Sequence, residues 1–129
     1  MSRFGWAPSA GPADRGQATV ETALLLPALV MAMLAVIQIG LVVHARVMVT
    51  HAAREAVRAA AVGESPTQVQ NVAVASGGLA PQRLSVSSVE ADGRVTVTVR
   101  YEAPTNVALI GALIDDVELT AEATMRRED

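Results

Sequence analysis

The stretch Thr22–Val43, TALLLPALVMAMLAVIQIGLVV, decides how this sequence folds. Its 22 residues carry no charge, and Gln38 is the one strongly polar side chain among them. A helix of that length spans roughly 33 Å, whereas the hydrocarbon core of a bilayer is about 30 Å thick. So small a chain offers little to surround a buried helix of this kind, and the run therefore predicts a transmembrane helix.

One alternative is a secretory signal peptide cut near Ala45, which would release a soluble protein beginning at Arg46. The apolar region of a signal peptide runs about 7–15 residues, and this run is longer, so a membrane anchor is favoured. Pro27 lies inside the run and removes one helical hydrogen bond. We therefore expect a kink or local unwinding at that position.

Helical spacing continues beyond Val43, because small apolar residues recur on one side of HARVMVTHAAREAVRAAAV while charged and histidine side chains gather on the other. No helix breaker occurs before Gly63. The pattern predicts one helix from about residue 17 to 62, apolar all round in its first half and amphipathic in its second.

The remaining segments predict a short helix and a sheet. Ser65 and Pro66 are typical of a helix start, and Gly77-Gly78 of its end. The alternating runs 83–90 and 94–102 flank Asp92-Gly93, which indicates a hairpin pairing Val86 with Val99 and Leu84 with Tyr101. A third alternating run follows at 117–128. The expected fold is α+β, a long amino-terminal helix packed on a small three-stranded antiparallel sheet.

Composition and motifs argue against catalysis. The 129 residues have a formal net charge of −3 and no cysteine, which gives no reason to expect nucleic-acid binding and rules out thiolate chemistry. His44 and His51 are seven residues apart, which is not the spacing of a helical zinc pair. The acidic cluster Asp115, Asp116 and Glu118 is more typical of a solvated loop than of a cation site. We expect no enzyme activity, no cofactor, no metal and no small-molecule substrate.

The region before the apolar run resembles a known family. A leader rich in Gly and Pro, residues 1–16 and expected to be disordered, ends in Gly16, and Glu21 precedes the uncharged helix. This order of features resembles that of a type IV prepilin. The residue pattern over 15–46 is similar to that of TadE-like pseudopilins of Tad (Flp) pilus systems. The matching positions are Arg15, Gly16, Val20, Glu21, Ala23, Leu26, Pro27 and Gly40. The sequence departs from the family pattern at Thr22 and at Gln38-Ile39, where aromatic and acidic-aromatic residues are usual.

The resemblance implies that a prepilin peptidase cuts between Gly16 and Gln17 on the cytoplasmic face. It implies a cytoplasmic leader 1–16, a transmembrane segment 17–43 and an extracytoplasmic pilin-like domain 44–129. The chain would be a single-pass membrane protein that takes part in pilus assembly with other pilins and the Tad machinery, either inside the surface pilus or as an assembly factor outside it. Counting arginines favours the opposite orientation, because the far side of the span holds more of them than the leader.

Glu21 has a physical role under this reading. Carboxylates near a bilayer are costly and mark functional positions, so a partner is expected. Cleavage would create an amine at Gln17, one helical turn away, which Glu21 could meet in its own subunit or in a neighbour, fixing axial register. Alternatively, Glu21 is an interfacial residue that only marks the water boundary. A separate alternative for the whole chain is a single-pass, membrane-anchored extracytoplasmic binding module without cleavage or filament assembly.

Overall fold

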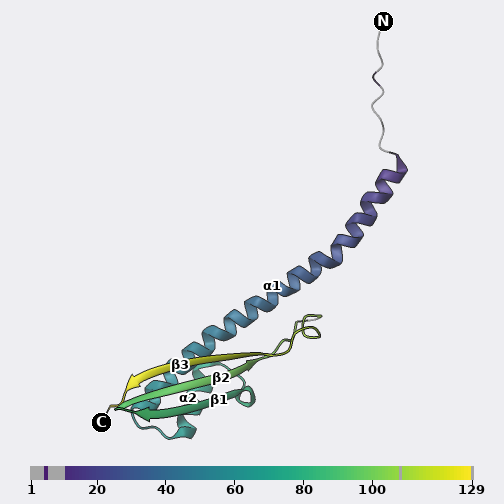
Figure 1. Ribbon diagram of the computed structural model, residues 1–129. Helices are drawn as coiled ribbons and strands as arrows, with labels where there is room; N and C mark the ends of the chain where they lie inside the picture. Colours follow the sequence, from purple (N-terminus) through teal and green to yellow (C-terminus); the bar gives the residue numbers. More distant parts are fainter. Residues whose placement is uncertain (1–4, 6–10, 108, 129) are drawn as a thin grey trace.

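The computed structural model describes residues 5, 11–107 and 109–128. Its elements, in chain order, are α1 (Pro12–Ala61), α2 (Pro66–Gly77), the 3₁₀ turn η1 (Pro81–Arg83), β1 (Leu84–Ala91), β2 (Arg94–Ala103) and β3 (Val117–Arg126). Figure 1 shows the carboxyl-terminal half of α1 packed with α2 and the sheet, while the amino-terminal half projects away from them. The predicted α+β fold is confirmed.

The long helix α1 begins earlier than the sequence predicts, at Pro12 rather than at about residue 17. Pro12 suits a first helical position because its fixed backbone angle and missing N–H cost nothing there. Asp14 in the first turn complements the positive end of the helix dipole. The expectation of a disordered leader is therefore wrong for 12–16, and most of the remaining leader lies outside the described residues.

Pro27 does not interrupt α1, which stays helical on both sides of it. Figure 1 shows the helix curving over its projecting half instead of breaking. Helix α1 ends at Ala61, and Gly63 follows with a φ of 86°, a left-handed conformation that glycine adopts without strain. Ser65 then caps α2 by accepting a hydrogen bond from the backbone N–H of Gln68 at 3.3 Å.

The sheet is antiparallel, with strand order β1-β2-β3. Its register pairs Leu84 with Tyr101 and Val86 with Val99, as the hairpin pattern predicts. Asp92 and Gly93 have φ angles of 53° and 69°, the left-handed pair that a tight hairpin turn requires. β3 then pairs along the full length of β2.

The core lies between the sheet and the second half of α1. The helix buries a stripe made mostly of alanine, which lets its backbone approach the sheet closely, and β2 supplies most of the largest fully buried side chains. The members from these two elements are Val49, Ala52, Ala53, Ala56, Val57, Ala60, Val95, Val97, Val99, Tyr101 and Ala103. The amphipathic half of α1 therefore covers the apolar face of the sheet, as predicted.

Candidate functional site

The motif Arg15–Glu21 lies in the first turns of α1, at the end far from the folded domain (Figure 1). All seven of its residues are exposed. A Cβ built on Gly16 would meet no atom within 4 Å, so the glycine is not required by packing. The Gly16–Gln17 peptide is thus accessible in the fold, within a helix end of the kind that frays.

Gln17 and Glu21 contact each other directly. The Gln17 Nε2 donates a hydrogen bond to Glu21 Oε1 at 3.4 Å across one helical turn. Thr19 and Thr22 donate their hydroxyls to the carbonyls of Arg15 and Ala18, both at 2.9 Å. The threonine hydroxyls are therefore satisfied within the helix, and the Glu21 carboxylate is the group that remains open to a further partner.

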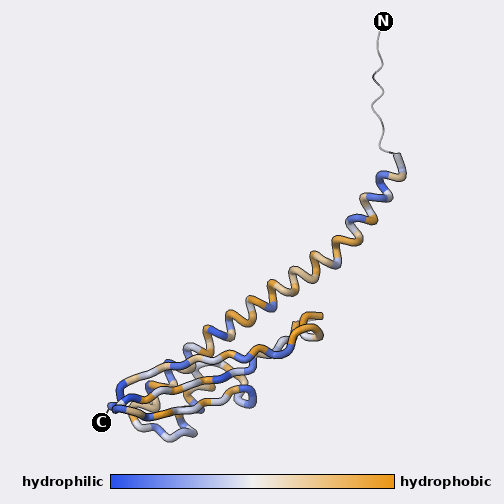
Figure 2. The backbone as a smooth tube through the Cα atoms, in the orientation of Figure 1, coloured by the Kyte–Doolittle hydropathy of each residue, from blue (hydrophilic) through white to orange (hydrophobic). Residues whose placement is uncertain are grey.

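The next part of α1 is apolar, and most of its side chains are exposed. It contains a stretch long and apolar enough to cross a membrane, and only 6% of the most apolar 18-residue window is buried within the protein. The core helix of a soluble domain would be mostly buried, so that alternative does not describe α1. Figure 2 shows the apolar colouring running along this projecting half and ending where the folded domain begins.

Pro27 belongs to this apolar half and stands apart from the motif. The structure thus brings Gly16, Gln17 and Glu21 together on neighbouring turns and does not place Pro27 with them. Sequence reasoning gave Gln38 no role, yet its side chain is only 6% exposed. In the described part of the chain neither its Nε2 nor its Oε1 has a hydrogen-bond partner. The available signal was its position as the one strongly polar residue of an uncharged run.

The charged face of α1 is solvated. His44, His51 and Arg54 are exposed, and Glu55 pairs with Arg58 at 3.7 Å, the spacing that the sequence indicates. Among the described residues no group of three or more His, Asp or Glu side chains could hold a metal ion. This face offers surface charge and no assembled site.

The acidic cluster after β2 has a structural contact that the sequence did not predict. Asp116 accepts hydrogen bonds from the Thr105 backbone N–H at 3.1 Å and from the Arg83 guanidinium at 2.9 Å. The Thr105 hydrogen bond, followed by the Arg83 contact, lowers the pKa of the Asp116 carboxyl. Arg83, Thr105 and Asp116, which we call the loop latch, close the base of the connection between β2 and β3.

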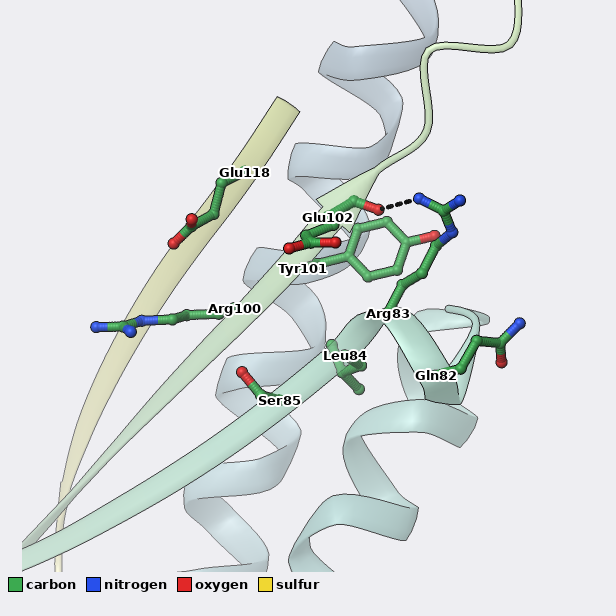
Figure 3. A pocket seen from close by; sticks show the side chains of 8 residues that line it. All are labelled: Gln82, Arg83, Leu84, Ser85, Arg100, Tyr101, Glu102 and Glu118. Atoms are coloured by element: carbon green, nitrogen blue, oxygen red, sulfur yellow. Dashed lines mark hydrogen bonds between the residues drawn. The ribbon is translucent and has the colours of Figure 1, made fainter. Parts of the chain in front are cut away.

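Figure 3 shows a shallow groove beside the latch, lined by η1 and by the ends of all three strands. Arg83 extends past Tyr101 and donates to the Glu102 carbonyl at 3.4 Å. The charged side chains of Arg100, Glu102 and Glu118 lie on the exposed face of the sheet. The groove is an open polar surface, without the enclosed apolar wall that a ligand site usually has.

Comparison with known proteins adds one finding. Residues 16–58 match the family model described as TadE-like protein, which confirms the resemblance over Gly16 and nearly all of the following helix. The family points to a Tad pilus-associated protein with an amino-terminal apolar helix. No curated protein and no solved structure matches the chain.

Proposed function

We propose that this chain is a TadE-like minor pilin or pseudopilin, anchored by one membrane span and processed by a prepilin peptidase after Gly16. The observation that carries the proposal is the exposed Gly16–Gln17 peptide, one turn before Glu21, at the start of a bare apolar helix. The family match supports the same order of parts, because it begins at Gly16. Its role is structural, with prepilin peptidase, other pilins and the Tad assembly machinery as partners.

Processing at Gly16 is compatible with the helical start of α1. Glycine inside a helix is less stable than alanine by roughly 0.5–1 kcal/mol, and the first turns of a helix fray. The segment around Gly16 can therefore unwind into a peptidase at low cost. Asp14, two residues before Gly16, stabilises the helix start without contacting the scissile bond in the described structure.

The glycine offers a clean test of processing. Because Gly16 has open space around it, Gly16→Leu removes the glycine that the peptidase reads and creates no clash at the Cβ position. We expect cells with an active peptidase to accumulate the full-length form of this variant. Gly5→Leu is the matched control, since Gly5 also has no atom within 4 Å of a built Cβ. Normal processing of Gly16→Leu would contradict the assigned cut.

Glu21 is proposed to fix the axial register of packed helices. Its carboxylate already reaches the Gln17 side chain, and the cut would leave a free amine on that residue. In a bundle of such helices, pairing with a neighbour's amine sets one relative height, as single buried polar pairs do in coiled coils. Because the proposed cleavage takes place on the cytoplasmic face, the carboxyl-terminal domain, residues 44–129, lies on the extracytoplasmic side in this proposal.

The register role is tested by Glu21→Gln, which keeps the shape and removes the charge. We expect the variant to be processed but to lower pilus yield in cells, whereas Glu64→Gln, an exposed residue between α1 and α2, leaves yield unchanged. Normal pilus yield from Glu21→Gln would contradict the register role while leaving processing intact.

A further inference from the structure

The connection between β2 and β3, residues 104–116, has a composition unlike that of a water-exposed loop. We call it the apolar loop. The stretch from Ala103 to Ile114, APTNVALIGALI, carries no charged residue. Its largest exposed side chains are Leu109, Leu113 and Ile114. Grouped apolar side chains of this size on a surface usually mark a contact with a partner or a membrane.

The apolar loop runs beside the membrane-spanning half of α1. Figures 1 and 2 show it leaving the end of β2 and extending along α1, away from the sheet and toward the amino terminus. At its start, Pro104 and Asn106 share a groove with Leu41, Val42 and Ala45.

Burial extends further along the same side of α1. Met31, Leu34, Ala35 and Gln38 are partly or fully buried at helical spacing, whereas most of their neighbours are exposed. Ile110 of the apolar loop is 5% exposed, although it lies outside the main core. The turns of α1 alone do not bury a side chain of this size, so a segment outside α1 covers Gln38, and the apolar loop, which starts beside Leu41 and Val42, is the described segment suited to do so.

This position corresponds to a shallow depth in a bilayer. Gln38 lies five residues inside the apolar run that ends at Val43, a distance of about 8 Å along the helix. Interfacial elements bury their apolar faces about 5–10 Å into the boundary between headgroups and acyl chains. The tip of the apolar loop would therefore reach this boundary.

Part of the backbone of the apolar loop is hydrogen-bonded within the loop itself, which lowers the cost of leaving water. The N–H of Gly111 donates to the Val107 carbonyl, and those of Leu113 and Ile114 donate to the Ile110 carbonyl, all at 3.0 Å. A loop that enters lipid must satisfy its polar backbone groups internally, because no water is available there. At the base, the Thr105 hydroxyl donates to the Asp115 carbonyl at 3.1 Å, which keeps the charged residues outside the tip.

We propose that the apolar loop is a second membrane-contacting element. Leu109, Leu113 and Ile114 insert into the lipid leaflet nearest the folded domain, while the inner side of the loop covers Gln38. Lipid is the occupant because the exposed side chains continue the apolar surface of α1 at the same depth. The inference rests on the proposed membrane span and does not depend on which side of the membrane holds the domain.

The consequence is an attachment at two points. A domain joined to a span by a helix alone can tilt about that helix, whereas an inserted loop fixes the rotation of the sheet relative to the bilayer. The outer face of the sheet, with Arg100, Glu118 and Glu122 exposed, would then keep a constant orientation toward neighbouring subunits.

Site-specific fluorescence tests the proposal on the full chain. The protein has no cysteine, so a single introduced cysteine carries the only label. The test site is Leu113→Cys, with Leu41→Cys inside the span as positive control and Val89→Cys on the sheet as negative control. The native side chains are comparably exposed, at 73%, 51% and 64%. Each variant is labelled with an environment-sensitive fluorophore and reconstituted in phosphatidylcholine and phosphatidylglycerol vesicles containing lipids spin-labelled near the top of the acyl chain.

We expect Leu113→Cys to be quenched by the spin-labelled lipid about as strongly as Leu41→Cys and several-fold more than Val89→Cys, with little quenching by aqueous iodide. Iodide quenching of Leu113→Cys at the level of Val89→Cys, with Leu41→Cys still quenched by lipid, would overturn the loop proposal and leave the span standing. A Leu41→Cys label that lipid does not quench would overturn the span and the loop together. If the Leu113→Cys label is protected from both quenchers, and if copies of the chain cross-link to each other, then a second copy of the chain and not lipid covers the apolar loop.

Discussion

Replacing Gln38 by leucine should stabilise the contact between the apolar loop and α1. Both polar side-chain atoms of Gln38 are buried, and neither finds a hydrogen-bond partner among the described residues. When the loop opens, water can reach the amide, so the buried state bears a desolvation cost of about 1–3 kcal/mol. Leucine has a similar volume and no polar atoms, so Gln38→Leu should recover most of this cost.

Hydrogen exchange measures the effect directly. In lipid nanodiscs, a gain of about 1–3 kcal/mol in the free energy of loop closure slows amide exchange by about 5- to 150-fold. We expect this slowing at the backbone amides of Gly111, Leu113 and Ile114, whose hydrogen bonds form within the loop. Gln70→Leu, the same chemical change at an exposed position of α2, should leave these amides unchanged.

A substitution that adds a charge at position 38 provides a second test of the same contact. Gln38→Glu places a carboxylate where the loop covers α1, and burying an unpaired charge costs more than burying an amide. Exchange of the same amides should then accelerate. Unchanged or faster exchange in Gln38→Leu would refute the reasoning, because it would mean that the loop does not bury Gln38 without a partner.

Three further predictions concern the loop and the core. Gly111→Ala should open the apolar loop, because the Cβ of the new alanine would lie 2.4 Å from a backbone carbonyl oxygen, and the loop amides should then exchange faster. Gly40→Ala, in open space, should not have this effect. Val97→Ala, at a fully buried position of β2, should lower the free energy of unfolding in detergent by about 2 kcal/mol, and the exposed Val89→Ala by under about 0.5 kcal/mol. The lowered pKa of Asp116 means that the folded state binds its proton less tightly than the unfolded state. Its stabilisation is therefore complete above the ordinary pKa of 3.8 and lost as pH falls through the lower folded value. The protection of the loop amides, corrected for the intrinsic exchange rate at each pH, should therefore fall more between pH 6 and pH 3 in the native protein than in Asp116→Asn.

The sequence was informative wherever one local rule dominated. The alternation of strand residues and the Asp92-Gly93 turn determined the hairpin register, because a one-residue slip would turn Val86 and Val99 to the wrong face. Helical spacing of alanines likewise located the face of α1 that covers the sheet. These features depend on neighbours along the chain or across a single turn.

One difference from the prediction is local, and two depend on contacts between distant segments. Helix α1 starts at Pro12, earlier than the glycine- and proline-rich composition of this region predicts, because proline is favourable in a first helical turn. The burial of Gln38 depends on where the connection after β2 lies, and no pattern within α1 reports that. The loop latch joins Arg83 to Asp116 across the sheet, so sequence spacing gave no signal for it.

The candidate motif was predicted from resemblance and local spacing together. Helical geometry alone places Glu21 one turn from Gln17, and the structure adds the 3.4 Å contact between their side chains. It also adds that Gly16 has no packing role in the described structure.

The central claim is that the chain is cut between Gly16 and Gln17. The direct measurement is the intact mass and amino-terminal sequence of the protein extracted from membranes of cells with an active prepilin peptidase. We expect a chain that begins at Gln17 and lacks tryptophan fluorescence, because the single tryptophan, Trp6, leaves with the leader. A membrane-extracted chain that retains residues 1–16 and Trp6 would contradict it.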